Sequence, residues 1–84
     1  MKILHIVRDQ DDARPLDVAR AQRQEGHQVS LLLIHDAVLR DVDFAPVVAG
    51  RDDVLARGGG ERYPMVDYPA MVGMIFENDR VVSW

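Results

Sequence analysis

The sequence predicts an α/β domain, a small three-layer sandwich of the flavodoxin or Rossmann type with a mostly parallel sheet of about four to five strands. Short apolar segments rich in β-branched residues alternate along the chain with segments that carry helix-end residues. This alternation is typical of parallel strands joined by right-handed crossovers. Because the chain has 84 residues, we expect residues 1–84 to form one domain.

The first strand and the first helix are predicted from the beginning of the chain. Residues 2–7 are almost continuously apolar and end at a polar run, which indicates a buried strand. Residues 13–25 predict a helix, with Pro15 in its first turn and Gly26 as its stop. The apolar stripe of this helix is thin and consists of Leu16, Val18, Ala19 and Ala21.

The next segment predicts a central strand. Residues 31–34 form an uninterrupted apolar run, entered through 27–30, and such a run fits a strand that is covered on both faces. A short helical turn is expected at 37–40. Residues 45–49 predict a third strand, with Pro46 near its entrance, where a missing N–H is least harmful.

The second half of the chain contains two further helices. Residues 51–57 predict a short helix that ends at glycine, and 63–66 predict a brief fourth strand. Asp67 is a good N-cap for a strongly apolar helix that extends to Phe76. Residues 80–84 predict the last strand. The apolar row of the last helix, formed by Met71, Met74, Ile75 and Phe76, is expected in the core or at a subunit interface.

The composition limits the classes of function. Ten basic and fourteen acidic side chains, with a net charge of −4, argue against direct nucleic-acid binding. The longest apolar run is too short to cross a membrane, and the N-terminal residues resemble no signal peptide, so we expect a cytoplasmic protein. The chain has no cysteine, which excludes disulfides and thiol chemistry of its own. Because no disulfide can stabilise so small a domain, we expect the protein to form an oligomer.

Most motifs in the chain have a structural explanation. The glycines at 58–60 follow a helix and are interpreted as a helix stop, because a phosphate loop follows a strand and opens a helix. Neither Ser30 nor Ser83 lies on a turn that could present a nucleophile. His5 and His27 are interpreted as structural. His5 and His35 could be neighbours across the sheet, but the histidines lack metal-ligand spacing. We therefore expect no catalytic triad, metal or cofactor.

The carboxyl ends of the predicted strands supply the candidate site. Ligands and partners of parallel α/β sheets meet the loops at this edge. Four residues there are the candidates for a ligand or partner contact: Arg8, His35, Asp36 and Arg51. The adjacent acids at 11–12 and 52–53 lie at helix starts and are explained by the helix dipole.

Several segments together resemble a known family. They are Leu4-His5-Ile6, the run from Leu31 to Val38, the stretch from Val54 to Gly58, and the ending from Val66 to Val72 and from Val82 to Trp84. In this order they are similar to the TusB/DsrH family, part of the DsrE/DsrF/DsrH-like superfamily of sulfur-relay proteins. The chain departs from that pattern at His35, where glutamine or glutamate is expected, at Ala37, where glycine is usual, and in being shorter between Leu39 and Pro46.

The resemblance implies a subunit of a sulfurtransferase relay, in tRNA wobble-uridine 2-thiolation or in sulfur oxidation. Its partners would be cysteine-containing DsrE- or DsrF-like (TusD- or TusC-like) subunits, because a thiolate must accept the sulfur. The first hypothesis is therefore a non-catalytic subunit that supports such a partner. The alternative is a stand-alone homo-oligomer that binds a small anion at Arg8, His35 and Arg51. A third hypothesis is an enzyme that uses His35 and Asp36 as general acid and base.

Overall fold

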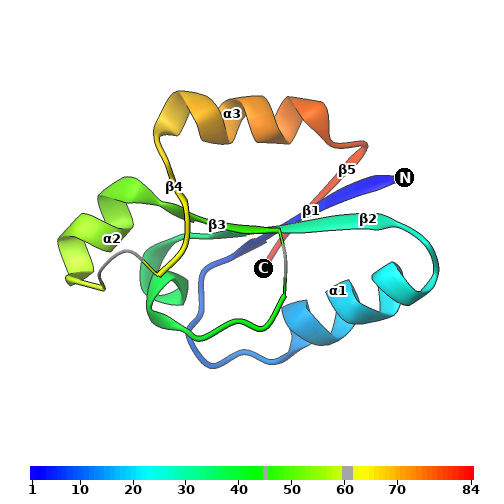
Figure 1. The fold of residues 1–84 in the computed structure, drawn as a ribbon, viewed down its shortest axis with the longest axis horizontal. Helices are drawn as coiled ribbons and strands as arrows, with labels where there is room; N and C mark the ends of the chain where they lie inside the picture. The colour runs from blue at the N-terminus through cyan, green and yellow to red at the C-terminus, as the bar shows by residue number, and fades with distance from the viewer. Residues whose placement is uncertain (45, 60–61) are drawn as a thin grey trace.

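The computed structural model describes residues 1–44, 46–59 and 62–84. Strands and helices alternate along the chain, as the sequence predicts (Figure 1). The elements are β1 (Lys2–Val7), α1 (Arg14–Gln24), β2 (Gln28–Leu33), the 3-10 helix η1 (His35–Leu39), β3 (Val47–Gly50), α2 (Arg51–Arg57), β4 (Met65–Val66), α3 (Tyr68–Glu77) and β5 (Arg80–Ser83).

The strands form one five-stranded sheet in the order β4-β3-β2-β1-β5. Every pair of neighbouring strands is parallel. The chain steps outward from β1 to β4, and α3 then carries it back across the sheet to β5, on the other side of β1. Figure 1 shows α1 and α3 on opposite faces of the sheet. The predicted three-layer α/β sandwich is thereby confirmed, with a sheet that is parallel throughout.

The main core lies between the sheet and the layer formed by α1, η1 and α2. Alternate residues of β1 and β2 point into this layer, because successive side chains of a strand face opposite sides. Two clusters fill it: Ile3, Leu16, Ala19, Val29, Leu31 and Phe44 pack near α1, and Val7, Leu33, Ala37, Val38, Ala49 and Val54 pack near η1 and α2.

Helix α1 contacts the sheet along a narrower line than the sequence indicated. Leu16 and Ala19 are buried together with Pro15, but Val18 and Ala21 are exposed. At about 100° per residue, Val18 and Ala21 lie away from the line through Leu16 and Ala19. The expectation that these two residues belong to the packed face was therefore wrong.

Strand β2 is the middle strand of the sheet, as predicted for residues 31–34. Leu31 and Leu33 are buried beneath the α1 layer, and Leu32 is buried on the opposite face. Leu4 of β1 is buried on the same face as Leu32. The dense apolar run thus reflects burial from both sides.

Helix α3 begins as the sequence predicts but is packed differently from a core helix. The Asp67 carboxylate accepts a hydrogen bond from the Ala70 N–H at 3.0 Å and caps the helix. Met71 and Met74 are only half-buried, and no residue of α3 is fully buried. Of the two expectations for the apolar row, core or subunit interface, the core is therefore not realised within this chain.

Other elements differ from the prediction at their ends. The helical turn expected at 37–40 is η1, which starts at His35. The third strand is Val47–Gly50, and residue 45 of the predicted strand lies outside the described residues. Gly58 ends α2 in the left-handed conformation at φ 65°, whereas Gly60 lies outside the described part. In the described ranges, no helix has the length and apolarity needed to cross a bilayer.

Candidate functional site

The carboxyl ends of β1, β2 and β5 meet at a hollow of about 410 Å³. Three of the four predicted site residues, Arg8, His35 and Asp36, line it. Arg51 does not line this hollow and is exposed at the first position of α2. The full lining is Arg8, Asp9, Asp12, Arg14, His35, Asp36, Arg57 and Trp84.

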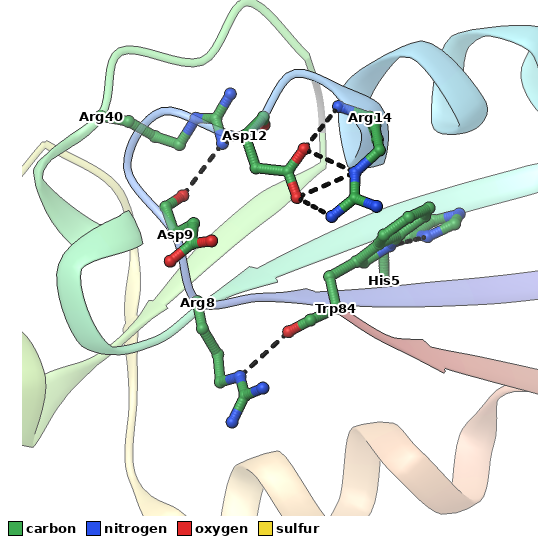
Figure 2. Close-up of polar contacts among 7 residues, drawn as sticks. All are labelled: His5, Arg8, Asp9, Asp12, Arg14, Arg40 and Trp84. Atoms are coloured by element: carbon green, nitrogen blue, oxygen red, sulfur yellow. Dashed lines mark hydrogen bonds and ion pairs between the residues drawn. The ribbon is translucent and has the colours of Figure 1, made fainter.

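Asp12 and Arg14 form a closely bonded ion pair at the rim of the hollow (Figure 2). Arg14 donates to the Asp12 carboxylate from Nη2 at 2.7 Å and from Nε at 3.0 Å, and its backbone N–H donates at 3.0 Å. The side-chain and backbone hydrogen bonds from Arg14 lower the pKa of Asp12 from 3.8 to about 2. The same pairing raises the pKa of Arg14. Asp12 thus lies just before α1 and binds both the backbone and the side chain of its first residue.

Arg40 fixes the loop that carries these acids. Its Nη1 donates to the carbonyl of Asp9 at 3.1 Å and to the carbonyl of Asp12 at 2.9 Å (Figure 2 draws the Asp9 bond). Arg40 could not be placed here from the sequence, because it lies 28 or more positions away from Asp9 and Asp12 along the chain. The β1–α1 loop therefore has a fixed course without any glycine.

Trp84 closes the hollow on the side of β5. Its backbone N–H continues the sheet by donating to Ile6 at 3.0 Å, and its carbonyl accepts from Arg8 Nε at 2.9 Å. The Arg14 guanidinium lies over the indole, 5.7 Å from the ring centroid. The indole N–H donates to His5 Nδ1 at 2.9 Å (Figure 2).

His5 is fully buried in the middle of β1 and has partners on both ring nitrogens. Because Nδ1 accepts the indole hydrogen, Nε2 carries the proton of the neutral ring and donates it to Gln22 Oε1 at 2.6 Å. The hypothesis that His5 and His35 are neighbours is not realised: His5 pairs with Leu31 in the sheet, and His35 follows the end of β2. His5 connects β1, α1 and the Trp84 side chain.

His35 stands at the end of β2 in a strained conformation. Its φ of 51° lies in the left-handed region, which costs an L-residue other than glycine about 1–2 kcal/mol. Its imidazole is largely exposed, and Nδ1 lies 4.0 Å from Asp53 Oδ1. Asp36 instead accepts from Arg57 Nε at 2.9 Å. His35 and Asp36, the candidate general acid and base, therefore interact with different residues and not with each other.

The charges of the hollow largely satisfy one another. Three arginines and three aspartates line it. Arg14 is bound to Asp12, and Arg57 bridges Asp36 and Asp53. Arg8 is exposed, and its Nε donates to the Trp84 carbonyl. The arrangement is a bonded polar network rather than a concentrated positive site.

Helix α3 carries the second notable feature, an exposed apolar surface. The apolar row that the sequence predicts for the core or a subunit interface includes Ile75 and Phe76 of this surface but not Tyr68 or Val72. Phe76 is 83% exposed, Tyr68 73% and Ile75 40%. With the half-buried Val72, these residues share one side of the helix, because their spacings are three, four and seven. We call Tyr68, Val72, Ile75 and Phe76 the α3 surface.

Comparison with known proteins leaves the family undecided. No protein-family model matches the sequence, and no curated protein matches it significantly. Among the residues that the structure describes, no group of three or more His, Asp or Glu side chains is arranged to hold a metal ion.

Proposed function

We propose that this protein is a non-catalytic, cysteine-free subunit of a sulfur-relay assembly, and that the α3 surface binds a cysteine-bearing partner of the DsrE or DsrF kind. The observation that carries the proposal is the exposure of α3. A helix that is apolar on all sides is normally buried. Here the side facing the sheet is half-buried, and the opposite side exposes two aromatic rings. An assembly would bury that side.

The composition of the α3 surface supports a protein partner. It contains two aromatic and two β-branched side chains and no charge. Aromatic residues are enriched and charged residues depleted at the centres of protein interfaces. The sulfur-relay role itself is supported by the resemblance to the TusB/DsrH family and by the α/β sandwich.

The absence of cysteine assigns the chemistry to the partner. In a persulfide transfer, the acceptor thiolate attacks the outer sulfur of the donor persulfide, a new S–S bond forms, and the donor leaves as a thiolate. This chain has no thiol to act as acceptor. Its contribution would be to hold and orient the partner that carries one.

The experiment is co-expression with each DsrE- and DsrF-like protein of the same organism, followed by sedimentation and mass measurement of the purified complex. We expect a stoichiometric complex. The double variant Tyr68→Ser, Phe76→Ser should weaken association at least about tenfold, since interface aromatics carry much of the binding free energy. Persulfide labelling of the complex should modify only the partner.

The matched control is Leu55→Ser. Leu55 is 69% exposed and apolar but lies on α2, outside the α3 surface. This variant should bind the partner as the unaltered protein does. A chain that remains alone with every such relative would contradict the proposal. Equal binding by the double variant, with its circular dichroism unchanged, would contradict the role of the α3 surface.

A second candidate function is the binding of a small anion at the hollow. One observation favours it: Arg8 and His35 line the same hollow from two neighbouring strands. Titration with inorganic phosphate should then give saturable binding that is lost in the double variant Arg8→Gln, His35→Gln. Arg51→Gln should have no effect, because Arg51 does not line the hollow. Saturable binding that persists in the double variant would reject this candidate.

A further inference from the structure

A larger hollow lies at the opposite edge of the sheet, where β1 and β2 begin. Its volume is about 540 Å³, within the range of small-molecule sites. Lys2, Ser30 and Met74 are among its lining residues, and they come from β1, β2 and α3. Figure 1 shows the start of β1, the α1–β2 turn and the end of α3 at the same end of the molecule. None of the residues considered for the carboxyl-edge site takes part.

The walls of this cavity are fixed by contacts of their own. Arg23 donates from Nη2 to the Val29 carbonyl at 3.1 Å, and its guanidinium lies over the Phe44 ring at 3.7 Å. Asn78 donates to the Met74 carbonyl at 2.7 Å and secures the last turn of α3. The cavity is therefore bordered by held groups on both the α1 and α3 sides.

Two opposite charges line the cavity without pairing to each other. Within the described ranges, the Lys2 ammonium and the Glu77 carboxylate form no ion pair. Both residues are exposed and line the cavity. The lining also includes the apolar residues Met74, Val29 and Pro46. The lining also contains a second cation, Arg23, which is held by the Val29 carbonyl and the Phe44 ring. An ammonium group, a carboxylate and apolar side chains are the elements that recognise a small zwitterion with an apolar side chain.

We infer that this amino-edge cavity binds a free α-amino acid with an apolar side chain. Lys2 would receive the carboxylate and Glu77 the ammonium group, while Met74 contacts the side chain. The unbranched thioether of methionine adapts to apolar groups of different shape, which suits such a contact. The inference does not depend on the proposed assembly, because none of the residues of the α3 surface lines this cavity.

The test uses three probes that share one apolar part: L-leucine, 4-methylpentanoate, which lacks the ammonium group, and 3-methylbutylamine, which lacks the carboxylate. Each is titrated into the ¹⁵N-labelled protein at neutral pH. L-leucine should shift the amide resonances of Ser30 and Met74 in a saturable manner. Each single-charge probe should bind at least about tenfold more weakly, as expected for the loss of one charge-assisted contact.

Two single substitutions test the contributions of the Lys2 ammonium and the Glu77 carboxylate to binding separately. Lys2→Gln should weaken L-leucine about tenfold and leave 3-methylbutylamine unchanged, and Glu77→Gln should weaken L-leucine and leave 4-methylpentanoate unchanged. Arg51→Gln, at the other edge of the sheet, is the control and should bind L-leucine normally. Absence of saturable shifts with L-leucine, equal binding of all three probes, or unchanged affinity in both variants would overturn the inference.

Discussion

At the scale of single residues, Trp84 and His5 depend on each other. They are 79 positions apart, yet the indole N–H is the donor for His5 Nδ1, and the two rings are stacked with centroids 6.0 Å apart. His5 is completely buried, so any ring nitrogen that loses its partner stays away from water. The stability of β1 is thus tied to a residue at the far end of β5.

Replacing Trp84 with phenylalanine tests this dependence. The variant keeps an aromatic ring but leaves His5 Nδ1 without its donor, and we expect the free energy of unfolding to fall by about 1–2 kcal/mol. Urea unfolding followed by circular dichroism measures the change. Tyr68→Phe, which alters an exposed hydroxyl, should remain within about 0.5 kcal/mol of the unaltered protein. An equal effect of the two substitutions would show that the indole hydrogen bond contributes nothing.

His35 illustrates a local conformational cost. Its φ of 51° suits glycine, which adopts this region without a Cβ penalty. His35→Gly should therefore raise the free energy of unfolding by about 1 kcal/mol, whereas His35→Ala should not. Thermal and urea unfolding of the two variants provide the comparison. If the glycine variant were less stable than the alanine variant, the imidazole would be contributing more than the backbone conformation costs.

The dependence of fold stability on pH in the acidic range should report on the ionisation of Asp12. Its folded-state pKa of about 2 lies below the ordinary value of 3.8, so its ionised form stabilises the fold. This contribution is complete above about pH 4 and is lost as the pH falls through about 2. A ¹³C NMR titration of the carboxyl group should show the low pKa. In Arg14→Gln the pKa should rise towards 3.8, and a pKa that stays low would exclude the Arg14 side chain as the main cause.

At the scale of elements, α3 shows what a capping signal can and cannot predict. The Asp67 cap and the end near Phe76 follow from local sequence, because caps depend on residues within one turn. The exposure of Tyr68 and Phe76 does not follow, because apolar spacing is the same whether a helix faces its own sheet or another molecule. The sequence therefore predicted the helix but left its environment open.

Gly58 and Gly73 distinguish the effect of backbone conformation on stability from the effect of the space available for a Cβ atom. An added Cβ would meet nothing within 4 Å at either Gly58 or Gly73, but only Gly58 has a positive φ, of 65°. Gly73→Ala, inside α3, should raise the free energy of unfolding by about 1 kcal/mol through helix propensity. Gly58→Ala, at the end of α2, should lower it by about 1 kcal/mol. Urea unfolding of both variants measures the change in the free energy of unfolding. A change in the same direction for the two variants would contradict this explanation.

At the scale of the whole molecule, the two faces of the sheet differ in how completely the helices that cover them are buried. The layer of α1, η1 and α2 buries both core clusters. Of the described helices, α3 covers the other face, and none of its own residues is fully buried. Stability should therefore vary across the domain, because local opening depends on the apolar contacts that an element makes.

Hydrogen exchange measures this variation. We expect the amides of β1 and β2 to exchange most slowly and those of the middle of α3 to exchange at least about tenfold faster, since fewer buried contacts hold that helix. NMR-detected exchange at several pH values gives the protection of each amide. Adding the proposed partner should slow the α3 amides selectively. Equal protection of α3 and β1 in the isolated protein would contradict the prediction that α3 opens more readily than the central strands.

The fold was more predictable than the site because strands and helices are encoded locally. The carboxyl-edge position of Arg8, His35 and Asp36 follows from the alternation of strands and helices in the sequence. Arg40 and Trp84 were missed as participants because their partners are distant in sequence and polar side chains carry no periodic signal. Without contact geometry, nothing in the sequence placed Arg40 or Trp84 beside the residues of the carboxyl-edge hollow.

The position of β1 has a consequence for the order in which the protein is made. Of the five strands in the described sheet, β1 is synthesised first, yet it pairs on one side with β2 and on the other with β5, the latest of the five. Until residues 80–84 leave the ribosome, the buried, apolar β1 presents an unpaired edge. The apolar α3 emerges before that edge can be closed. The pairing of β1 with β5 is therefore made only after β5 has been synthesised, and we expect the nascent chain to be most prone to aggregation before this step.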